Sequence, residues 1–189
     1  SAVCRTAIGK TFAARGNLEE AFKHYENALQ IAKECYGNEH TFVAEIVNNI
    51  GDANLLRGEL KSAEEDFKLA YQINHKCFGK EHPVVAADLN RMGSVALQRK
   101  DYSLAENLFH QSAEINSKIY GNNHHSIARD NNSFGCLEKE KGNLLLALDH
   151  FKKALLIAKS VYKTIQHPFI AIVADNYGYT KLELKTYSE

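Results

Sequence analysis

The sequence has little proline and cysteine, no net charge and no long apolar run. Its 189 residues include 2 Pro and 4 Cys, and 23 Lys and Arg balance 23 Asp and Glu. The absence of net charge argues against broad electrostatic binding to nucleic acid or to an anionic membrane. No apolar run approaches the roughly 18 residues of a membrane span, and no signal-peptide pattern opens the chain.

Patterns that predict disulfides or β-strands are also missing. The cysteines are few for the length and far apart, so we expect free, buried or partly buried thiols and a reducing, cytoplasmic compartment. Runs that alternate Val, Ile or Thr with polar residues between turn signals are absent, which argues against a β fold. The composition therefore indicates an all-α protein.

A period of 42 residues organises the whole chain. The glycines Gly9, Gly51, Gly93, Gly135 and Gly178 are spaced by 42, 42, 42 and 43 residues, with the extra residue between Tyr162 and His167. Three further columns keep the period: Ala21, Ala63, Ala105, Ala147; Tyr25, Phe67, Phe109, Phe151; and Tyr36, Phe78, Tyr120, Tyr162. Such agreement indicates repeats that stack because one unit cannot bury its apolar face alone.

Each repeat is predicted to contain two helices. Apolar residues recur at three- and four-residue steps, Pro83 and Pro168 fall at helix starts, and glycines follow the second helices. The predicted helices are 2–15, 18–36, 41–57, 60–77, 83–99, 102–119, 125–141, 144–162 and 168–184.

The repeat resembles the tetratricopeptide family. The order of small, aromatic and Ala–Leu positions stands as "IGKTFAARGNLEEAFKHYENAL" and "FGCLEKEKGNLLLALDHFKKAL", and the connectors "YGNEH" and "FGKEHP" are similar to those of kinesin light chains. The resemblance implies a right-handed α-solenoid of stacked antiparallel helix pairs, with first helices lining a concave groove.

We expect a single repeat domain over residues 1–189. Its repeats would cover about 1–39, 40–81, 82–123 and 124–166, with a partial repeat at 167–189. Since that last repeat lacks a second helix, we expect this chain to be a fragment of a longer protein.

Two chemical motifs have simpler explanations. The letters "GKT" at Gly9 end a phosphate-binding loop in other proteins, but the first glycine and the preceding strand of that loop are missing here. The histidines His40, His82, His124 and His167 lie one repeat apart, too far to share a metal ion. We expect them to cap or brace the next helix, and we expect no metal site and no cofactor.

Asparagine near the column glycine is the stronger lead, because it is a poor interior helix former. A side-chain amide both donates and accepts, so it can bind the backbone of an extended peptide. The alternative is an internal ladder of Asn side chains that braces neighbouring helices. The candidate peptide-binding residues are Lys10, Asn48, Asn49, Asp52, Asn90, Arg91, Arg129 and Asn132.

The predicted function is protein–protein interaction, with an extended partner peptide in the groove. Asn49 and Arg91 match the carboxylate clamp of some family members, but Thr6, Lys10 and Ala87 do not. The mixed groove therefore favours a polar, possibly acidic peptide. The alternative is a structural scaffold that holds flanking domains, or a module that self-associates through the solenoid ends, with the groove unused in either case. No converging catalytic set appears, so we do not expect an enzyme.

Overall fold

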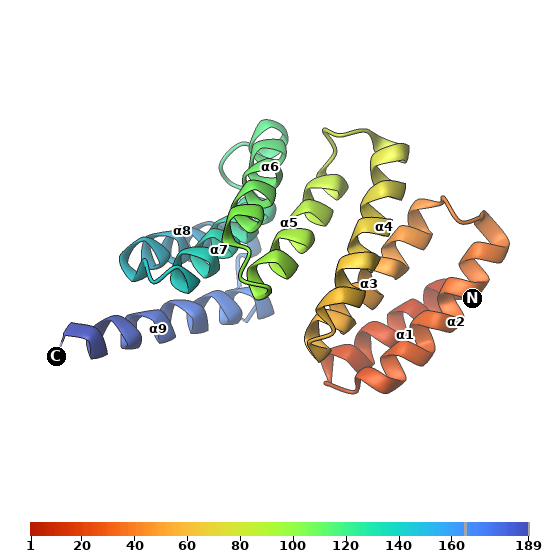
Figure 1. Ribbon diagram of the computed structural model, residues 1–189, viewed down its shortest axis with the longest axis horizontal. Coiled ribbons are helices and arrows are strands. Elements are labelled where there is room, and N and C mark those ends of the chain that lie inside the picture. Colours follow the sequence, from red (N-terminus) through yellow and green to blue (C-terminus); the bar gives the residue numbers. More distant parts are fainter. Residues whose placement is uncertain (165, 189) are drawn as a thin grey trace. The chain divides into compact units, whose positions relative to one another are not determined.

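The computed structural model describes residues 1–164 and 166–188, with side chains described to Thr186 apart from residue 165. These residues form nine α-helices and no strand (Figure 1). The helices are α1 (Ala2–Ala14), α2 (Leu18–Tyr36), α3 (Thr41–Arg57), α4 (Leu60–Phe78), α5 (Pro83–Gln98), α6 (Tyr102–Tyr120), α7 (His125–Glu140), α8 (Leu144–Tyr162) and α9 (Pro168–Ser188). The predicted bounds are confirmed to within one residue, except that α9 extends beyond the predicted end at 184. The extra residue of the last connector lies between Tyr162 and His167. This segment includes residue 165, which lies outside the described residues.

The chain divides into two compact units. Unit 1 is Ser1–Val95 and unit 2 is Ala96–Glu189, so the boundary falls inside α5. In unit 1, α2 packs against α1 and α3, and α4 packs against α3. In unit 2, α7 packs against α6 and α8, and α8 packs against α9. The single domain expected from the sequence stays a prediction.

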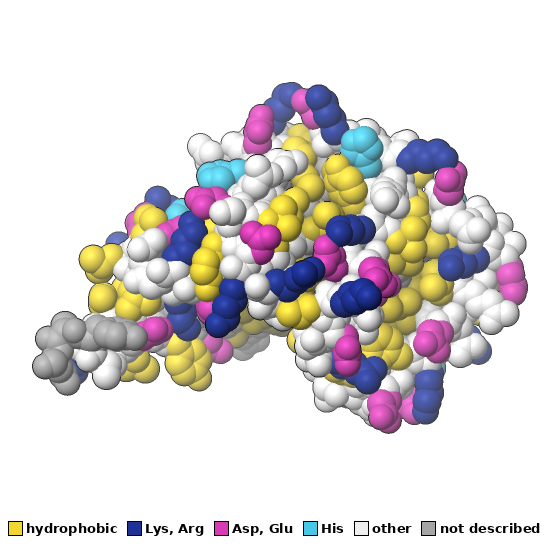
Figure 2. Space-filling model, in the orientation of Figure 1, with side chains coloured by type: hydrophobic (Ala, Val, Ile, Leu, Met, Phe, Trp, Pro, Cys, Tyr) yellow, Lys and Arg dark blue, Asp and Glu magenta, His cyan; other side chains and the backbone are white. Residues whose placement is uncertain are grey.

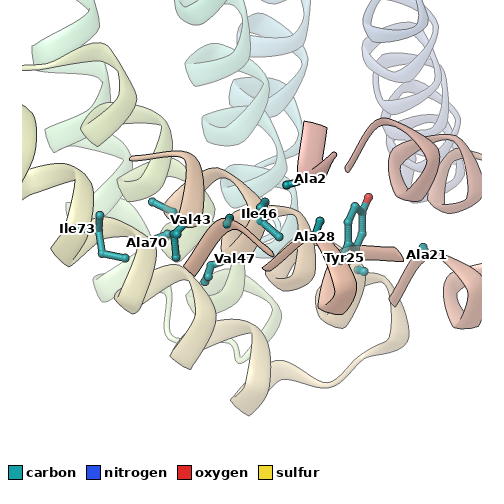
Figure 3. Packing of buried hydrophobic residues seen from close by; sticks show 12 residues of the cluster. Ala2, Ala21, Tyr25, Ala28, Val43, Ile46, Val47, Ala70 and Ile73 are labelled. Carbon is teal, nitrogen blue, oxygen red and sulfur yellow. The ribbon is translucent and has the colours of Figure 1, made fainter. Parts of the chain in front are cut away.

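Small residues allow the two helices of a repeat to pack closely, as predicted. A Cβ atom placed at Gly51 would lie 2.6 Å from Cε1 of Phe67 in the following helix. Phe67 and Ala63 are fully buried. A small residue and an aromatic ring also meet at Gly9 and Tyr25, and Tyr25 belongs to a buried cluster formed by α1, α2, α3 and α4 (Figure 3). We call this arrangement the glycine–aromatic contact.

The connector histidines cap and brace the next helix, which confirms the prediction. The Nδ1 atom of His40, His82, His124 or His167 accepts the backbone N–H two residues later, at 3.1–3.2 Å. Each ring also stacks on the aromatic residue that ends the preceding helix, with centroids 3.5–4.7 Å apart. Each histidine therefore fixes one connector.

No helix in the described ranges is both long and apolar enough to cross a membrane.

Candidate functional site

Side chains of neighbouring first helices form ion pairs on one face of unit 1. Lys10 of α1 lies 2.7 Å from Glu45 of α3, and Asp52 of α3 lies 3.2 Å from Nε of Arg91 in α5. Asn49 lies on α3 between the two acidic residues and donates its amide N–H to the Glu45 carbonyl, at 2.8 Å. We call these five residues the first-helix surface of unit 1.

The ion pairs leave this surface accessible and nearly neutral. The side chains of Lys10 and Glu45 are 49% and 51% exposed, and Arg91 and Asp52 are 30% and 45% exposed. Exposed pairs contribute about 0–1 kcal/mol each, so a ligand could replace them at small cost. Lys10, Asn49, Asp52 and Arg91 thus lie close together with Glu45, which the sequence analysis did not single out, and their role in peptide binding stays a prediction.

Asn48 and Asn90 require a correction, because both are buried. Only 7% of Asn48 and 6% of Asn90 is exposed. Nδ2 of Asn48 donates to Oδ1 of Asp88 at 2.7 Å, and Nδ2 of Asn74 donates to Oδ2 of Asp88 at 2.7 Å. The internal amide brace, which the sequence left open as the alternative, therefore describes Asn48. We call Asn48, Asn74 and Asp88 the polar layer of unit 1.

A related polar layer lies in unit 2. Asp130 accepts from the Ser112 hydroxyl at 2.8 Å and from Nδ2 of Asn116 at 2.8 Å. Asp88 and Asp130 are one 42-residue period apart, as are Asn74 and Asn116, so the sequence did carry this signal. Sequence reasoning missed it because the paired residues lie on different helices.

Burial perturbs the Asp88 carboxyl. Loss of solvent raises the pKa of Asp88, and the hydrogen bonds from Asn74 and Asn48 offset only part of this effect. The layer therefore contains a fully buried carboxyl whose charged form depends on its amide partners.

The first-helix surface of unit 2, which we define as Arg129, Asn132, Lys139, Asn176 and Glu183, borders a cavity through Lys139 and Asn176. Here Asn176 of α9 donates to Oδ1 of Asn132 in α7 at 3.0 Å, and Lys139 lies 3.8 Å from Glu183. Arg129 is exposed on α7. The cavity has a volume of about 440 Å³ and is lined by residues of α5, α7, α8 and α9 and the α5–α6 turn: Leu97, Gln98, Lys100, Cys136, Lys139, Glu140, Phe151 and Asn176.

Lys100 adopts a backbone conformation that the other repeats give to glycine. Its φ is 62°, whereas Gly16, Gly58 and Gly142 hold the equivalent positions with φ of 77°, 79° and 83°. A left-handed conformation costs a side-chain-bearing residue about 1–2 kcal/mol. Strained residues of this kind gather at functional sites, and Lys100 lines the cavity.

Cys136 lies at the wall of the cavity but is not an activated nucleophile. Burial raises the pKa of its thiol to about 11, so the thiolate is scarce at neutral pH. The four thiols are free, but Cys4, Cys35 and Cys77 are exposed, contrary to the buried or partly buried positions expected for them.

Charges of both signs are interspersed on the molecular surface. Acidic and basic side chains alternate over the face shown in Figure 2, with no large patch of one sign. In the described ranges, no three or more His, Cys, Asp or Glu side chains gather closely enough to hold a metal ion.

Comparison with known proteins agrees with this architecture. The tetratricopeptide repeat model matches residues 3–76, 42–115 and 84–160. The crystal structure of BtubC (BKLC) from P. vanneervenii is similar, with a TM-score of 0.72 and 19% identity over 93% of this chain and 70% of that one.

Two crystal structures of a putative kinesin light chain from Podosopora anserina, with nearly identical TPR-like repeats, are also similar. Both have a TM-score of 0.69, at 16% and 17% identity, over 97% of this chain and 86% of theirs. No curated protein matches the sequence. The likeness is therefore one of fold, the α-solenoid of stacked helix pairs that the sequence predicted.

Proposed function

The chain belongs to the tetratricopeptide repeat family, and we propose that it binds an extended segment of a partner protein along its first helices. Repeats of this family generally mediate protein–protein interactions and are generally non-enzymatic. The observation that carries the proposal is that, within each unit, partly exposed side chains join neighbouring first helices. These joins are Lys10 with Glu45, Asp52 with Arg91, Asn132 with Asn176 and Lys139 with Glu183.

The chemistry of these surfaces favours a polar peptide that carries an acidic residue. In unit 1 the charges are paired, and Oδ1 of Asn49 remains an acceptor for a peptide N–H. In unit 2, Lys100 and Lys139 line the cavity together with the single carboxylate of Glu140. Leu97 and Phe151 supply apolar contact there. An acidic side chain of the peptide would thus enter the cavity of unit 2.

The test is capture of partners from cells of the source organism, followed by mass spectrometry, with charge-reversal variants. Lys100→Glu plus Lys139→Glu should lose the partner that the wild-type chain retains. Lys152→Glu plus Lys153→Glu, on exposed positions of α8, is the matched control and should retain it. Equal capture by both variants, with unchanged helicity, would rule out the first-helix surface of unit 2 as the binding site.

Self-association is a second candidate function, and exposed apolar side chains favour it. In α9, Ile172, Tyr179 and Leu182 are 54%, 66% and 65% exposed, and in α1 Val3 is 62% exposed. Light scattering over a range of protein concentrations should then show oligomers that Tyr179→Asp dissociates. A monomer at every concentration would exclude this function.

We propose the cytoplasm as the compartment. Four free thiols, three of them exposed, suit a reducing environment. Localisation of the tagged chain by fluorescence microscopy tests this assignment, and a secreted or luminal protein would contradict it.

A further inference from the structure

The outward face of α8 differs from the same face of the other second helices. Leu145 and Leu156 lie there, and 72% and 61% of these residues are exposed. They are 11 residues apart, which corresponds to about three turns and about 16 Å along the helix. In α2, α4 and α6 the two equivalent positions hold exposed polar residues: Glu19, Lys61 and Ser103 for the first, and Gln30, Gln72 and Glu114 for the second.

Lysines accompany the exposed leucines along this face. By helical spacing, Lys152 and Lys159 lie on the same side of α8 as the two leucines, and both are exposed. Asp149 pairs with Lys153 at 2.7 Å, whereas in the described part of the chain neither Lys152 nor Lys159 forms an ion pair. We call the following residues the α8 face: Leu145, Lys152, Leu156 and Lys159.

The charge of α8 also differs from that of the other second helices. Within its bounds, three lysines accompany one acidic residue, whereas acidic residues equal or outnumber the lysines in α2, α4 and α6. The neutrality of the whole chain does not cancel this local excess, because exposed charges interact over only about 8–10 Å at moderate salt concentration. The α8 face therefore combines apolar and positively charged side chains in an otherwise balanced surface.

The stacking of repeats leaves this face open. At all positions equivalent to the α8 face, the residues of α2, α4 and α6 are exposed, although each of these helices is followed by another helix pair. The packed side of α8 is the opposite one, where Ala147, Phe151 and Ala154 are fully buried. Further repeats after α9 would leave the α8 face exposed in the same way. A molecule that covers it therefore comes from outside the stack of repeats.

We propose that the α8 face binds the surface of an anionic lipid bilayer. Charge complementarity carries the assignment: the lysines bind the anionic headgroups, while Leu145 and Leu156 enter the boundary between headgroups and acyl chains. A lysine suits this boundary because its long apolar stem can lie beside a buried leucine while its charged end stays among the headgroups. Peripheral attachment of this kind needs no helix that spans the membrane.

Two protein partners fit this face less well. A second copy of the chain bound face to face would place lysine against lysine, and such contacts between like charges are unfavourable. A partner helix packs on a continuous apolar stripe, whereas lysines separate Leu145 from Leu156 here. A bilayer accepts this interrupted row, because each leucine inserts on its own and the lysines between them meet anionic groups.

Sedimentation of the 189-residue chain with lipid vesicles tests the proposal. The chain should bind phosphatidylcholine vesicles that contain about one-third phosphatidylserine, and should not bind vesicles of phosphatidylcholine alone. Binding should weaken as the salt concentration rises, because salt screens the lysines.

Variants of α8 locate the binding. Lys152→Glu plus Lys159→Ser should weaken binding to the anionic vesicles about tenfold or more, and Leu145→Ser plus Leu156→Gln should weaken it several-fold, because less apolar surface is buried. The fold should tolerate these substitutions, since each installs a residue that stands at the equivalent position of another second helix: Glu26, Ser117, Ser103 and Gln30.

Lys61→Ser plus Lys68→Glu is the matched control, because it makes the same change of charge at exposed lysines of α4. It should leave vesicle binding unchanged. Circular dichroism of each variant establishes that it folds. The proposed peptide surface lies on the first helices, so the α8 variants should still capture the peptide partner, and the two proposals can fail separately.

Three results would overturn the proposal. The first is that the wild-type chain does not bind the anionic vesicles, and the second is that both α8 variants bind them as tightly as the wild type does. The third is retention of the chain on immobilised polyglutamate without binding to vesicles, which would show that an acidic protein covers the α8 face instead.

Discussion

At the scale of single residues, the glycine column is explained by the ring beside it. A Cβ at Gly51 would lie 2.6 Å from Cε1 and 2.8 Å from Cδ1 of Phe67, and that ring is fully buried. Because the ring cannot move into solvent, we expect Gly51→Ala to lower the free energy of unfolding by about 1–3 kcal/mol. Urea denaturation measures the change.

Gly178→Ala is the matched control for Gly51→Ala. Nothing lies within 4 Å of its Cβ position, and alanine in a helix interior is favoured over glycine by about 0.5–1 kcal/mol. The control should therefore be neutral or slightly more stable than the wild type. Equal losses in the two variants would contradict the steric explanation of the column.

The thiol of Cys136 should react differently from the other three. Burial raises its pKa to about 11, while Cys4, Cys35 and Cys77 are exposed. Because the thiolate is the nucleophile, iodoacetamide near neutral pH should alkylate Cys136 more slowly, by about tenfold or more. Mass spectrometry of a time course resolves the sites. Unfolding in urea should abolish the difference, and a single rate for all four in the folded chain would refute it.

At the scale of helices, the polar layer replaces an apolar one found elsewhere in the same molecule. Asn74 and Asp88 occupy the positions that Ala32 and Ile46 hold one repeat earlier, and all four are buried. Asn48 corresponds in the same way to Thr6, whose hydroxyl bonds within its own helix to the Ala2 carbonyl. The polar set and the apolar set are therefore each complete only as a whole. If alanine stood at position 74, the Asp88 carboxyl would lose the amide donor that it binds.

Asn74→Ala alone should therefore destabilise the chain by about 2–3 kcal/mol, because it leaves an oxygen of the buried Asp88 without a donor. The triple variant Asn48→Thr, Asn74→Ala, Asp88→Ile installs the complete apolar set and should regain most of that loss. Chemical denaturation of both variants measures the difference. If the triple variant were less stable than the single one, the two sets would not be interchangeable.

The helices could be predicted because the signals that begin and end them are local in the sequence. The direction in which each side chain points around its helix could not be predicted. Caps, prolines, glycines and apolar spacing fixed each helix end within a few residues. Asn48 and Asn49 are neighbours in sequence, yet one rotates about 100° from the other around α3. That rotation buries Asn48 against Asp88 and leaves Asn49 on the surface. One position along the helix therefore decides whether a predicted peptide-binding residue lies on the surface or in the interior.

Tertiary neighbours explain the remaining misses. Glu45 pairs with Lys10 across 35 residues, and the cavity of unit 2 combines residues from Leu97 to Asn176. No local pattern encodes such pairs. The column of Gly16, Gly58, Lys100 and Gly142 did contain the anomaly, but only the positive φ of Lys100 showed that the lysine keeps the glycine conformation.

At the scale of the whole molecule, the net charge is zero. The dependence of stability on pH then comes from the few carboxyl groups whose pKa values are shifted in the fold. Burial raises the pKa of Asp88 and of Asp66, and hydrogen bonds from their Asn neighbours offset this only in part. For Glu138, burial alone would raise the pKa, but hydrogen bonds from Asn143 and Lys141 outweigh it and lower the pKa. As the pH falls through the acid range, the two aspartates therefore increase the stability of the fold, whereas Glu138 decreases it.

The sign for Asp88 follows from linkage. A folded-state pKa above the unfolded value means that the fold binds the proton more tightly, so its contribution to stability is complete below the unfolded pKa of about 3.9. That contribution is lost as the pH rises through the folded pKa. Asp88→Asn removes the titration, and the buried, unpaired Oδ1 atoms of Asn48 and Asn74 offer acceptors for the new amide.

We therefore expect the wild type to lose stability relative to Asp88→Asn as the pH rises from about 4 toward 7. Urea denaturation of both proteins at several pH values across this range gives the difference directly. Glu138 and Asp66 titrate in both proteins, so their contributions cancel in the comparison. Parallel stability curves would show that Asp88 keeps its ordinary pKa, and a difference of the opposite sign would show that its amide partners outweigh burial.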